Sequence, residues 1–322
     1  MRESGLLNHI YARSAGLAAR FPQVVAGPGD DCAVIASPGG ERLLLKVDQL
    51  IEGRHFVGPV SARADAPTPI NLVARKALAR PISDIAASGG TPWAALATAA
   101  LPSNFDQHTA DELFSAMAGW AEHWGCPLVG GDIAATEPDS AGRPAPVALT
   151  VTIVGVPHRS RGPVARSGAR LGDAIYVTGQ IGGSFDSGRH LTFEPRLAEA
   201  RWLCATLGPD LHAMMDLSDG LGLDAARLAR ASRVNVELDA ASIPLHAGVA
   251  DWLKACGDGE DYELLLAVEP GRVLPPTCPW TGTPLTRIGV VQPQREGSPA
   301  CVVRTPSGVV DLSEAGWEHR EP

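Results

Sequence analysis

Residues 147–172 read VALTVTIVGVPHRSRGPVARSGARLG, and this stretch divides the chain in two. Its first part, residues 147–156, is rich in β-branched valine, isoleucine and threonine, which is typical of a strand. In the rest of the stretch the apolar pattern gives way to glycine, arginine and proline, a composition typical of a connection. We therefore expect two domains, formed by residues 1–158 and 159–322.

Strand and helix patterns alternate on both sides of this junction. Residues 43–48, LLLKVD, predict a strand with Lys46 and Asp48 on one face. Val47 takes the opposite face, which we expect to point toward the core. Further helices are expected at 4–20, 71–87 (kinked or interrupted by Pro81), 106–124, 195–207 and 221–231, and further strands at 127–129, 174–178, 234–238, 262–268, 286–291 and 301–304. The alternation predicts two mixed α/β (α+β) domains.

The composition is that of an acidic globular protein. The chain of 322 residues has 27 Lys+Arg and 36 Asp+Glu, a formal net charge of −9, and 45% of its residues are hydrophobic. Because it has no run of Lys or Arg, it lacks the electrostatic footprint of a nucleic-acid-binding protein. Its longest apolar stretches are shorter than the roughly 20 residues of a membrane span. We therefore expect neither nucleic acid nor a membrane as a partner.

Several familiar motifs are missing. The six cysteines form no C-x-x-C pair, so neither a zinc site nor a disulfide framework is predicted. The N-terminus lacks the apolar core of a signal peptide, and together these features favour a cytoplasmic protein. The chain has no G-x-x-x-x-G-K-[ST] sequence, which excludes a P-loop. The glycine turn GQIGGS at 179–184 is by itself weak evidence for nucleotide binding.

Aspartates occupy glycine turns and strand ends along the whole chain, where α/β proteins place ligand-binding residues. They are Asp30, Asp31, Asp48, Asp84, Asp132, Asp216 and Asp219. Carboxylates that converge without Lys or Arg partners repel one another unless hard cations bridge them. Because Mg²⁺ combines one or two carboxylates with phosphate oxygens, the set suggests a Mg-nucleotide site.

Each aspartate also has a simpler interpretation. Asp219 fits the N-cap of the helix expected at 221–231. Asp132 fits a turn, and Asp30 and Asp31 fit a solvated loop. The sequence alone does not show that the carboxylates converge, so both interpretations stay open at this point.

Eight motifs follow one another along the chain: GPGDDCAVI (27–35), VDQLIEGRHF (47–56), ISDIAASGG (82–90), VGGDIA (129–134), ARSGARLGD (165–173), MDLSDGLGLD (215–224), GEDYELLL (259–266) and GW-x-H (316–319). In this order the chain resembles the thiamine-monophosphate kinase family, of the superfamily that includes aminoimidazole ribonucleotide synthetase. The resemblance spans essentially the whole chain. The IEGRHF, GEDYEL and GW-x-H segments are more specific to the kinases than the other motifs are.

The resemblance implies a fold, an assembly and a reaction. Two α/β domains are expected, with the N-terminal sheet pairing with its counterpart across a homodimer and ATP lying along the dimer cleft. ATP and thiamine monophosphate would give ADP and thiamine diphosphate, with several Mg²⁺ ions. No catalytic general base is expected, because the acceptor phosphate is largely dianionic near neutral pH, its second pKa being about 6.

The resemblance also implies a site. The Mg²⁺ ligands would be Asp30, Asp31, Asp48, Asp84, Asp132, Asp216 and Asp219. ATP would contact Gly131, Asp132, Arg166 and Ser218. The acceptor pocket would contain His55, Glu260 and Trp317, with Trp317 stacking on the heteroaromatic rings and Glu260 offsetting the thiazolium charge. Without the motifs, His55 would be interpreted as a surface-loop residue and Trp317 as a packing residue.

Lys46 departs from the family, which usually has small hydroxyl residues just before the strand-end aspartate. We hypothesise that its ammonium group takes the place of one Mg²⁺ and contacts ATP phosphate oxygens. The alternative is that Lys46 only pairs with Asp48 or a neighbouring aspartate. Arg80-Pro81 and Asp258-Gly259 are further departures.

Two other functions remain open from the sequence. One is a related ATP-dependent kinase or synthetase of the same superfamily with a different acceptor. A selenophosphate-synthetase-like role is disfavoured, because Cys32 has no neighbouring lysine to lower its pKa. The other is a non-catalytic nucleotide-binding homologue, against which the near-complete aspartate set argues.

Overall fold

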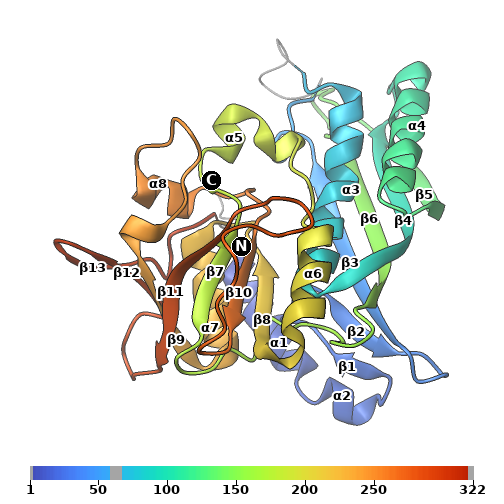
Figure 1. The fold of residues 1–322 in the computed structure, drawn as a ribbon. Helices are drawn as coiled ribbons and strands as arrows, with labels where there is room; N and C mark the ends of the chain where they lie inside the picture. The colour runs from blue at the N-terminus through green and yellow to red at the C-terminus, as the bar shows by residue number, and fades with distance from the viewer. Residues whose placement is uncertain (1–2, 59–66, 318–322) are drawn as a thin grey trace.

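The chain forms two β-sheets with helices packed on and between them (Figure 1). A computed structural model describes residues 3–58 and 67–317. Six strands from residues 24–157 form one sheet, and seven strands from residues 174–311 form the other. This architecture confirms the mixed α/β fold. The domain boundary expected near residue 158 falls between the two sheets and stays a prediction.

The N-terminal sheet has the strand order β1-β2-β3-β6-β4-β5. Its half of the chain contains α1 (Glu3–Ser14), α2 (Leu17–Arg20), β1 (Val24–Ala26), β2 (Ala33–Ala36), β3 (Arg42–Ile51), α3 (Ile70–Ala87), β4 (Gly90–Pro102), α4 (Gln107–His123), β5 (Leu128–Thr136) and β6 (Ala148–Pro157). Neighbouring strands are antiparallel except for β4 and β5, which are parallel. Helix α3 packs on β3, β6 and β4, and α4 packs beside α3. The apolar core of this half lies under these two helices.

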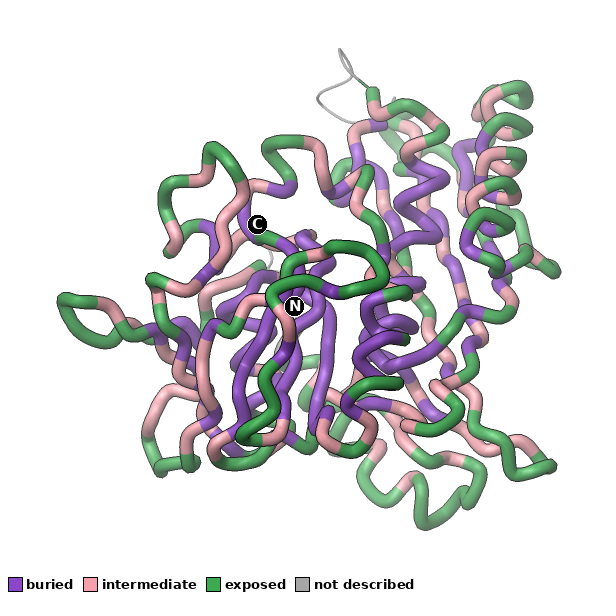
Figure 2. The backbone as a smooth tube through the Cα atoms, in the orientation of Figure 1, coloured by how far each residue is buried: buried purple, intermediate pink, exposed green. Residues whose placement is uncertain are grey.

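The C-terminal sheet has the order β13-β12-β9-β11-β7-β10-β8. Its elements are β7 (Ala174–Thr178), α5 (Ser184–Ser187), η1 (Arg189–Leu191), α6 (Leu197–Leu207), η2 (Gly208–Asp210), β8 (Leu211–Asp216), α7 (Leu221–Ser232), β9 (Val234–Asp239), η3 (Ala240–Ser242), α8 (Trp252–Gly257), β10 (Leu264–Val268), β11 (Leu285–Pro293), β12 (Cys301–Thr305) and β13 (Gly308–Asp311). Strands β7, β8 and β10 are buried along their whole length (Figure 2). Two apolar clusters cover them, one on the face of α6 and one on the face of α7.

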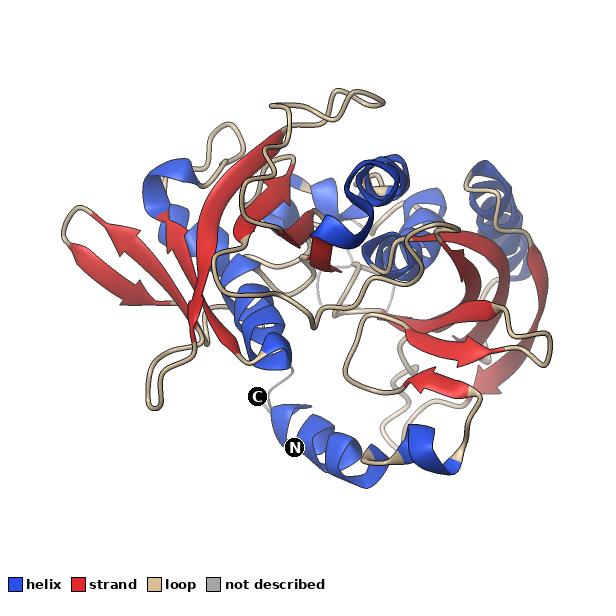
Figure 3. Ribbon diagram, turned by 60° about the horizontal axis from the view of Figure 1, so that its bottom comes forward, coloured by secondary structure: helices blue, strands red, loops and turns tan. Residues whose placement is uncertain are grey.

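Helix α3 lies between the two sheets, and the turned view of Figure 3 shows the sheets on opposite sides of a central group of helices. It contacts β3 of the first sheet and β8 and α6 of the second half. The expected interruption at Pro81 does not occur, because α3 continues through Pro81 to Ala87. Proline removes one backbone donor from the helix, and burial on several sides holds the helix together despite that loss.

The buried face of strand β3 is the opposite of the one expected from the sequence. Val47 is 58% exposed, whereas Leu44 is fully buried under α3, so the expectation that Val47 points toward the core was wrong. Lys46 and Asp48 alternate with Val47 and therefore share the covered face with Leu44. Placing charged side chains under a helix requires polar partners there.

Further differences concern missed elements and element boundaries, since strands β1, β2, β4, β8 and β13 and helix α8 were not predicted. The opening helix is broken at Gly16, whose φ of 73° suits glycine, into α1 and α2. Strand β4 was not predicted, because its alanines and prolines carry little strand signal. Asp132 lies inside strand β5 rather than in a turn.

A buried histidine ties the far end of the C-terminal sheet together. His212 Nδ1 lies 2.8 Å from Asp173 Oδ2, and His212 Nε2 lies 2.9 Å from Glu269 Oε2. Both the His212 and Asp173 side chains are almost wholly buried, whereas Glu269 is partly exposed. His212 lies near the start of β8, and Asp216 lies at the other end of the same strand. We therefore assign this group a structural role.

We expect His212→Leu to lower the free energy of unfolding by about 3–5 kcal/mol, because it removes the imidazole partner of the buried Asp173 carboxylate and leaves only the backbone N–H of Arg170 to donate to it. Glu269→Gln is the matched control and should cost less than about 1 kcal/mol, since Glu269 is partly exposed. Urea denaturation at pH 7 measures both. Equal losses for the two variants would contradict the assigned role of Asp173 and His212.

Candidate active site

A stripe of polar side chains runs along one side of the largely apolar helix α3. Its members are Lys76, Arg80, Ser83 and Asp84. Their spacing of i, i+4, i+7 and i+8 places them on one side of the helix. Lys76 and Ser83 contact the C-terminal half, and Arg80 and Asp84 contact the N-terminal half. The stripe therefore connects the two halves of the molecule.

Three carboxylates meet at the C-terminal end of this stripe. Asp31 comes from the loop between β1 and β2, Asp84 from α3, and Asp216 from the end of β8. Each offers an oxygen atom, and these atoms all lie within 4.8 Å of one another. All three residues are buried. The structure thus brings together three of the seven expected metal ligands from three separate parts of the chain.

The carboxylate cluster of Asp31, Asp84 and Asp216 is electrostatically strained. Burial, and then repulsion from Asp216 and Asp48, raise the pKa of Asp84 well above its usual value although Lys46 attracts it. Burial and the charge of Asp31 raise the pKa of Asp216 to about 7, although Ser83 donates a hydrogen bond of 2.6 Å to its Oδ2. A divalent cation would relieve this repulsion.

The donor set fits Mg²⁺. Hard cations prefer oxygen ligands, and the cluster supplies carboxylate oxygens only. The buried Oδ2 atom of Asp31 has no hydrogen-bond partner among the described residues. An unpartnered buried carboxylate oxygen is unfavourable, and coordination of a cation would satisfy it.

Cationic side chains surround the cluster. Lys46 Nζ lies 2.6 Å from Asp84 Oδ1, and Arg80 Nε lies 3.6 Å from Asp48 Oδ2. The guanidinium group of Arg166 pairs with Asp31, and its backbone N–H donates to Asp30 Oδ1 at 3.0 Å. Burial alone would lower the pKa values of all three cations, but nearby acidic groups outweigh it and raise them. These groups are carboxylates for Lys46 and Arg166, and Tyr262 followed by carboxylates for Arg80. All three side chains therefore stay charged.

Four expected ligands lie outside the three-carboxylate cluster. Asp48 borders it, within electrostatic range of Lys46, Asp84 and Asp216. Asp30 lies beside Asp31 and holds Arg166. Asp219 instead pairs with Arg227, and its backbone N–H donates to Asp224 Oδ2 at 2.9 Å. The simpler expectation, that Asp219 caps α7 through its side chain, is not observed, because the N-cap is Gly220.

Gly131 and Asp132 lie far from the cluster within this chain. In the register of the sheet, Asp132 aligns with Thr98, Thr150 and then Gln49. It is thus three strand spacings, about 14 Å, from β3 and faces the side opposite to Asp48. A Cβ atom at Gly131 would lie 1.8 Å from the carbonyl oxygen of Ala97, so close strand pairing requires glycine there. Within one chain, Asp132 and Asp84 do not share an ion.

The residues expected around the acceptor gather at the other end of the stripe. Lys76 Nζ lies 2.8 Å from the carbonyl oxygen of His55 and 2.5 Å from Glu260 Oε2. Burial, and then the positive charge of Arg80, lower the pKa of His55 to about 3, so its imidazole is neutral. The backbone N–H of Glu260 donates to the carbonyl oxygen of Ser218 at 2.7 Å. Glu260 therefore lies beside the turn formed by residues 218–220.

Trp317 lies next to the same turn. Its backbone N–H donates to the carbonyl oxygen of Asp219 at 2.8 Å, and the residue is 44% exposed. An indole at this position has exposed surface for stacking. The last two residues of the GW-x-H motif, Glu318 and His319, lie outside the described residues.

Sequence reasoning did not find Lys76, Arg80, Ser83 or His190 as site residues. For the first three, the polar stripe on an apolar helix was a readable signal, since the helix itself was predicted. His190 gave no such signal, because it follows a short glycine turn and its partners lie far away in the sequence. Its contact with Glu260 exists only in the folded chain.

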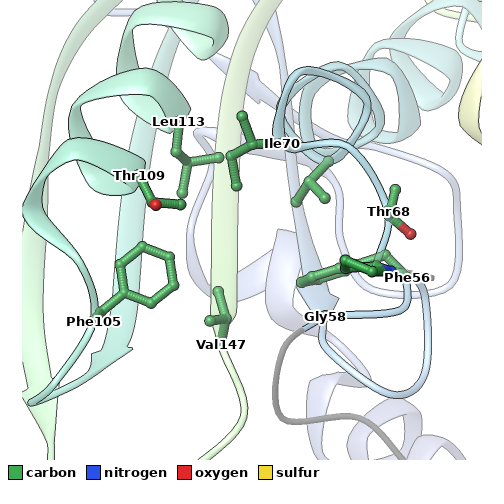
Figure 4. A pocket seen from close by; sticks show the side chains of 10 residues that line it. Phe56, Gly58, Thr68, Ile70, Phe105, Thr109, Leu113 and Val147 are labelled. Carbon is green, nitrogen blue, oxygen red and sulfur yellow. The ribbon is translucent and has the colours of Figure 1, made fainter. Parts of the chain in front are cut away.

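A separate cavity of about 260 Å³ opens between α3 and α4 (Figure 4). Its walls are mainly apolar, including Phe56, Ile70, Phe105 and Leu113. None of its ten lining residues is ionisable, so the cavity cannot hold a triphosphate or its metal.

Comparisons with known proteins show what the chain is similar to. Residues 29–156 match the family described as AIR synthase related protein, N-terminal domain. Thiamine-monophosphate kinase of Rhodopirellula baltica is 34% identical over 293 residues, 86% of each chain. That of Bacillus subtilis is 29% identical and aligns over 99% of each chain.

A solved structure described as AaThiL complexed with AMPPCP and TMP has a similar fold. Its TM-score is 0.76 at 27% sequence identity, and the match covers 99% of this chain and 97% of that one. From the ordered motifs, the buried carboxylate cluster and this similarity over nearly the whole length, we conclude that the chain belongs to the thiamine-monophosphate kinase family.

Proposed function

We propose that this protein transfers the γ-phosphoryl group of ATP to thiamine monophosphate and so forms ADP and thiamine diphosphate. The observation that carries the proposal is the buried cluster of Asp31, Asp84 and Asp216 with its unpartnered carboxylate oxygen. A family member of similar fold is described as a complex with AMPPCP and TMP, an ATP analogue and the acceptor, which supports both substrates.

The reaction needs charge compensation more than it needs a base. The acceptor is a phosphate monoester that is largely dianionic near pH 7, since its second pKa is about 6. The barrier arises from repulsion between this dianion and the triphosphate. Mg²⁺, when bound, offsets that charge and aligns the reacting groups. In this chain Asp31, Asp84 and Asp216 would hold it, with Asp30 and Asp48 beside them and Asp219, now paired with Arg227, in the turn that follows β8.

The chain's own cations would complete the ATP site. Arg166, now paired with Asp31, presents guanidinium donors that suit phosphate oxygens. Lys46 lies against Asp84, in the place where a cation would bridge carboxylates. This contact supports the interpretation of Lys46 as a tethered cation, and it also satisfies the simpler pairing interpretation. Ser218 would contact ATP from the turn that also carries Asp219.

The acceptor would lie at the Lys76 end of the stripe, beside His55, Glu260 and Trp317. This arrangement puts the residues around Lys76 and the carboxylate cluster about two helical turns apart along α3, since Lys76 and Asp84 are eight residues apart. That separation, about 12 Å, suits a substrate whose rings and phosphate occupy opposite ends of the site.

We further propose a homodimer formed through strand β5. This edge strand is exposed on most of its length, and it carries Val129 and Ile133, exposed by 65% and 64%. Exposed apolar edge strands are sites of pairing with another chain. Pairing there would also give Gly131 and Asp132 a role, since a partner subunit could bring them to a site that they do not reach within one chain.

A cytoplasmic location also belongs to this proposal. All six cysteines are free and buried, which suits a reducing compartment. In the described part of the chain, no helix has both the length and the apolar character of a membrane span.

Release of ADP from Mg-ATP should depend on thiamine monophosphate. Asp84→Asn should lower that turnover by about a thousandfold or more, because charge stabilisation is the main catalytic contribution. In EDTA the variant should melt at a higher temperature than the wild type, because Asp84 is repelled by its neighbours. Asp139→Asn, in an exposed loop, is the control and should behave as wild type.

Three outcomes of this assay would contradict the assignment. ADP release with only another acceptor would indicate a different kinase of the superfamily. The absence of ADP release with any acceptor would indicate a non-catalytic homologue. Retention of more than half of the activity by Asp84→Asn at saturating Mg²⁺ would remove the metal site from this position.

Lys46→Thr should weaken activity at low Mg²⁺ and recover it at high Mg²⁺, with a steeper dependence on metal concentration. The reason is that a free ion must then occupy the place of the Lys46 ammonium beside Asp84. A Mg²⁺ titration of both proteins measures this. Curves that superimpose after scaling would leave Lys46 with a pairing role only.

Ile133→Glu should convert the dimer to a monomer and lower activity, because a charge would be buried in the paired edge. Light scattering coupled to gel filtration measures the mass. Val273→Glu is the matched control, since Val273 is 85% exposed in the other half of the chain. A wild-type protein that is monomeric at micromolar concentration would refute the proposed assembly.

A further inference from the structure

Lys76 is a fully buried lysine whose Nζ donates to two oxygen acceptors, Glu260 Oε2 and the carbonyl oxygen of His55, and lies close to one imidazole nitrogen. Its Nζ atom lies 2.5 Å from Glu260 Oε2, 2.7 Å from His190 Nδ1 and 2.8 Å from the carbonyl oxygen of His55. A buried ammonium group is very unfavourable without a counterion, and Glu260 is the carboxylate that supplies it. The two side chains form a compensated ion pair inside the acceptor end of the site.

The backbone of Glu260 is fixed as firmly as its side chain. Its φ of 64° is left-handed, a conformation that costs a residue with a Cβ atom about 1 kcal/mol or more. Hydrogen bonds to Ser218 and from Ser184 Oγ, the latter at 2.7 Å to the Glu260 carbonyl oxygen, hold it there. Because these hydrogen bonds hold the backbone in this conformation, the position of the Glu260 carboxylate is well defined.

His190, itself buried, completes the arrangement around Glu260. Its Nδ1 atom lies 3.0 Å from Glu260 Oε2, so this oxygen faces two nitrogen atoms. The imidazole stacks on Phe185, with ring centroids 4.4 Å apart and an interplanar angle of 18°. Phe185 is 49% exposed, so the stacked pair forms an aromatic wall next to the carboxylate.

These contacts change the role expected for Glu260. Its charge is already balanced by Lys76, so it offers little net attraction to a ring cation. Burial raises the pKa of Glu260, but the hydrogen bond from His190 and the charge of Lys76 outweigh it and bring the pKa to about 2. The carboxylate is thus ionised, and its Oε1 atom has no hydrogen-bond partner among the described residues. An ionised oxygen of this kind accepts a strong hydrogen bond.

We infer that Lys76 and His190 position Glu260 as a charge-compensated hydrogen-bond acceptor, which selects an acceptor molecule by an N–H donor on its aromatic ring system and not by a ring cation. Lys76 is a positioning residue in this scheme. The inference rests on the proposed function, and in thiamine monophosphate the matching donor is the exocyclic amine of the pyrimidine ring.

Two analogues separate the alternatives in the wild-type protein. Deazathiamine monophosphate has no ring cation but keeps the amine, and 4′-deaminothiamine monophosphate keeps the cation but has lost the amine. We expect the KM of the first to stay within about threefold of that for thiamine monophosphate. The KM of the second should rise about tenfold or more, the effect of losing one hydrogen bond to a charged group.

The opposite order of the two analogues would overturn the inference and restore Glu260 as a counterion. Equal KM values for all three acceptors would also overturn it. The wild-type comparison needs no substitution and so decides the question even where a variant does not fold. Absence of turnover with thiamine monophosphate itself would instead refute the proposed function.

Lys76→Met tests the positioning role directly. Removing the ammonium leaves Glu260 uncompensated, so the preference for thiamine monophosphate over its deaza analogue should rise about tenfold at pH 7, where Lys76 of the wild type is mostly charged although burial lowers its pKa to about 8. The KM for ATP should change less than twofold. Lys254→Met is the matched control, because Lys254 pairs with Asp186 on the surface, and its analogue preference should equal that of the wild type. A folded Lys76→Met protein with unchanged analogue preference would contradict the proposal.

Discussion

Four carboxylates, those of Asp31, Asp48, Asp84 and Asp216, meet in and around the space between α3 and the two sheets. Burial and mutual repulsion raise the pKa values of Asp84 and Asp216, so the arrangement opposes folding unless positive charge enters it. The chain supplies part of that charge from Lys46, Arg80 and Arg166. In the proposed function, a divalent cation that arrives with phosphate groups would offset the remaining imbalance.

Helix α3 distributes this chemistry along its length. The polar stripe of Lys76, Arg80, Ser83 and Asp84 lies on one side of the helix. A single rigid element therefore sets the spacing between the residues around Lys76 and the carboxylate cluster. Both halves of the chain contribute to each end of the stripe. A change in how the two halves pack would therefore alter both ends of the stripe together.

Much of this organisation was readable in the sequence. The alternation of apolar and polar residues gave most helices and strands, including β7 at its observed bounds and α7 to within one residue. The ordered motifs identified the family and the aspartates. Strand β4 and the exposed face of Val47 were not readable, because alanine-rich strands give a weak signal and periodicity does not say which face a helix covers.

The sequence by itself determined which residue types carry the proposed chemistry, since the aspartates and Glu260 lie in short motifs and Lys46 stands out as the residue that departs from the family two positions before Asp48. Only the tertiary structure decided which of them meet. It joined Asp31, Asp84 and Asp216, separated Asp132 onto an edge strand, and brought Lys76 and His190 to Glu260. The physical reason is that repulsion, burial and charge pairing depend on distance in space, and residues as far apart as 76 and 260 become neighbours only after two sheets have packed on one helix.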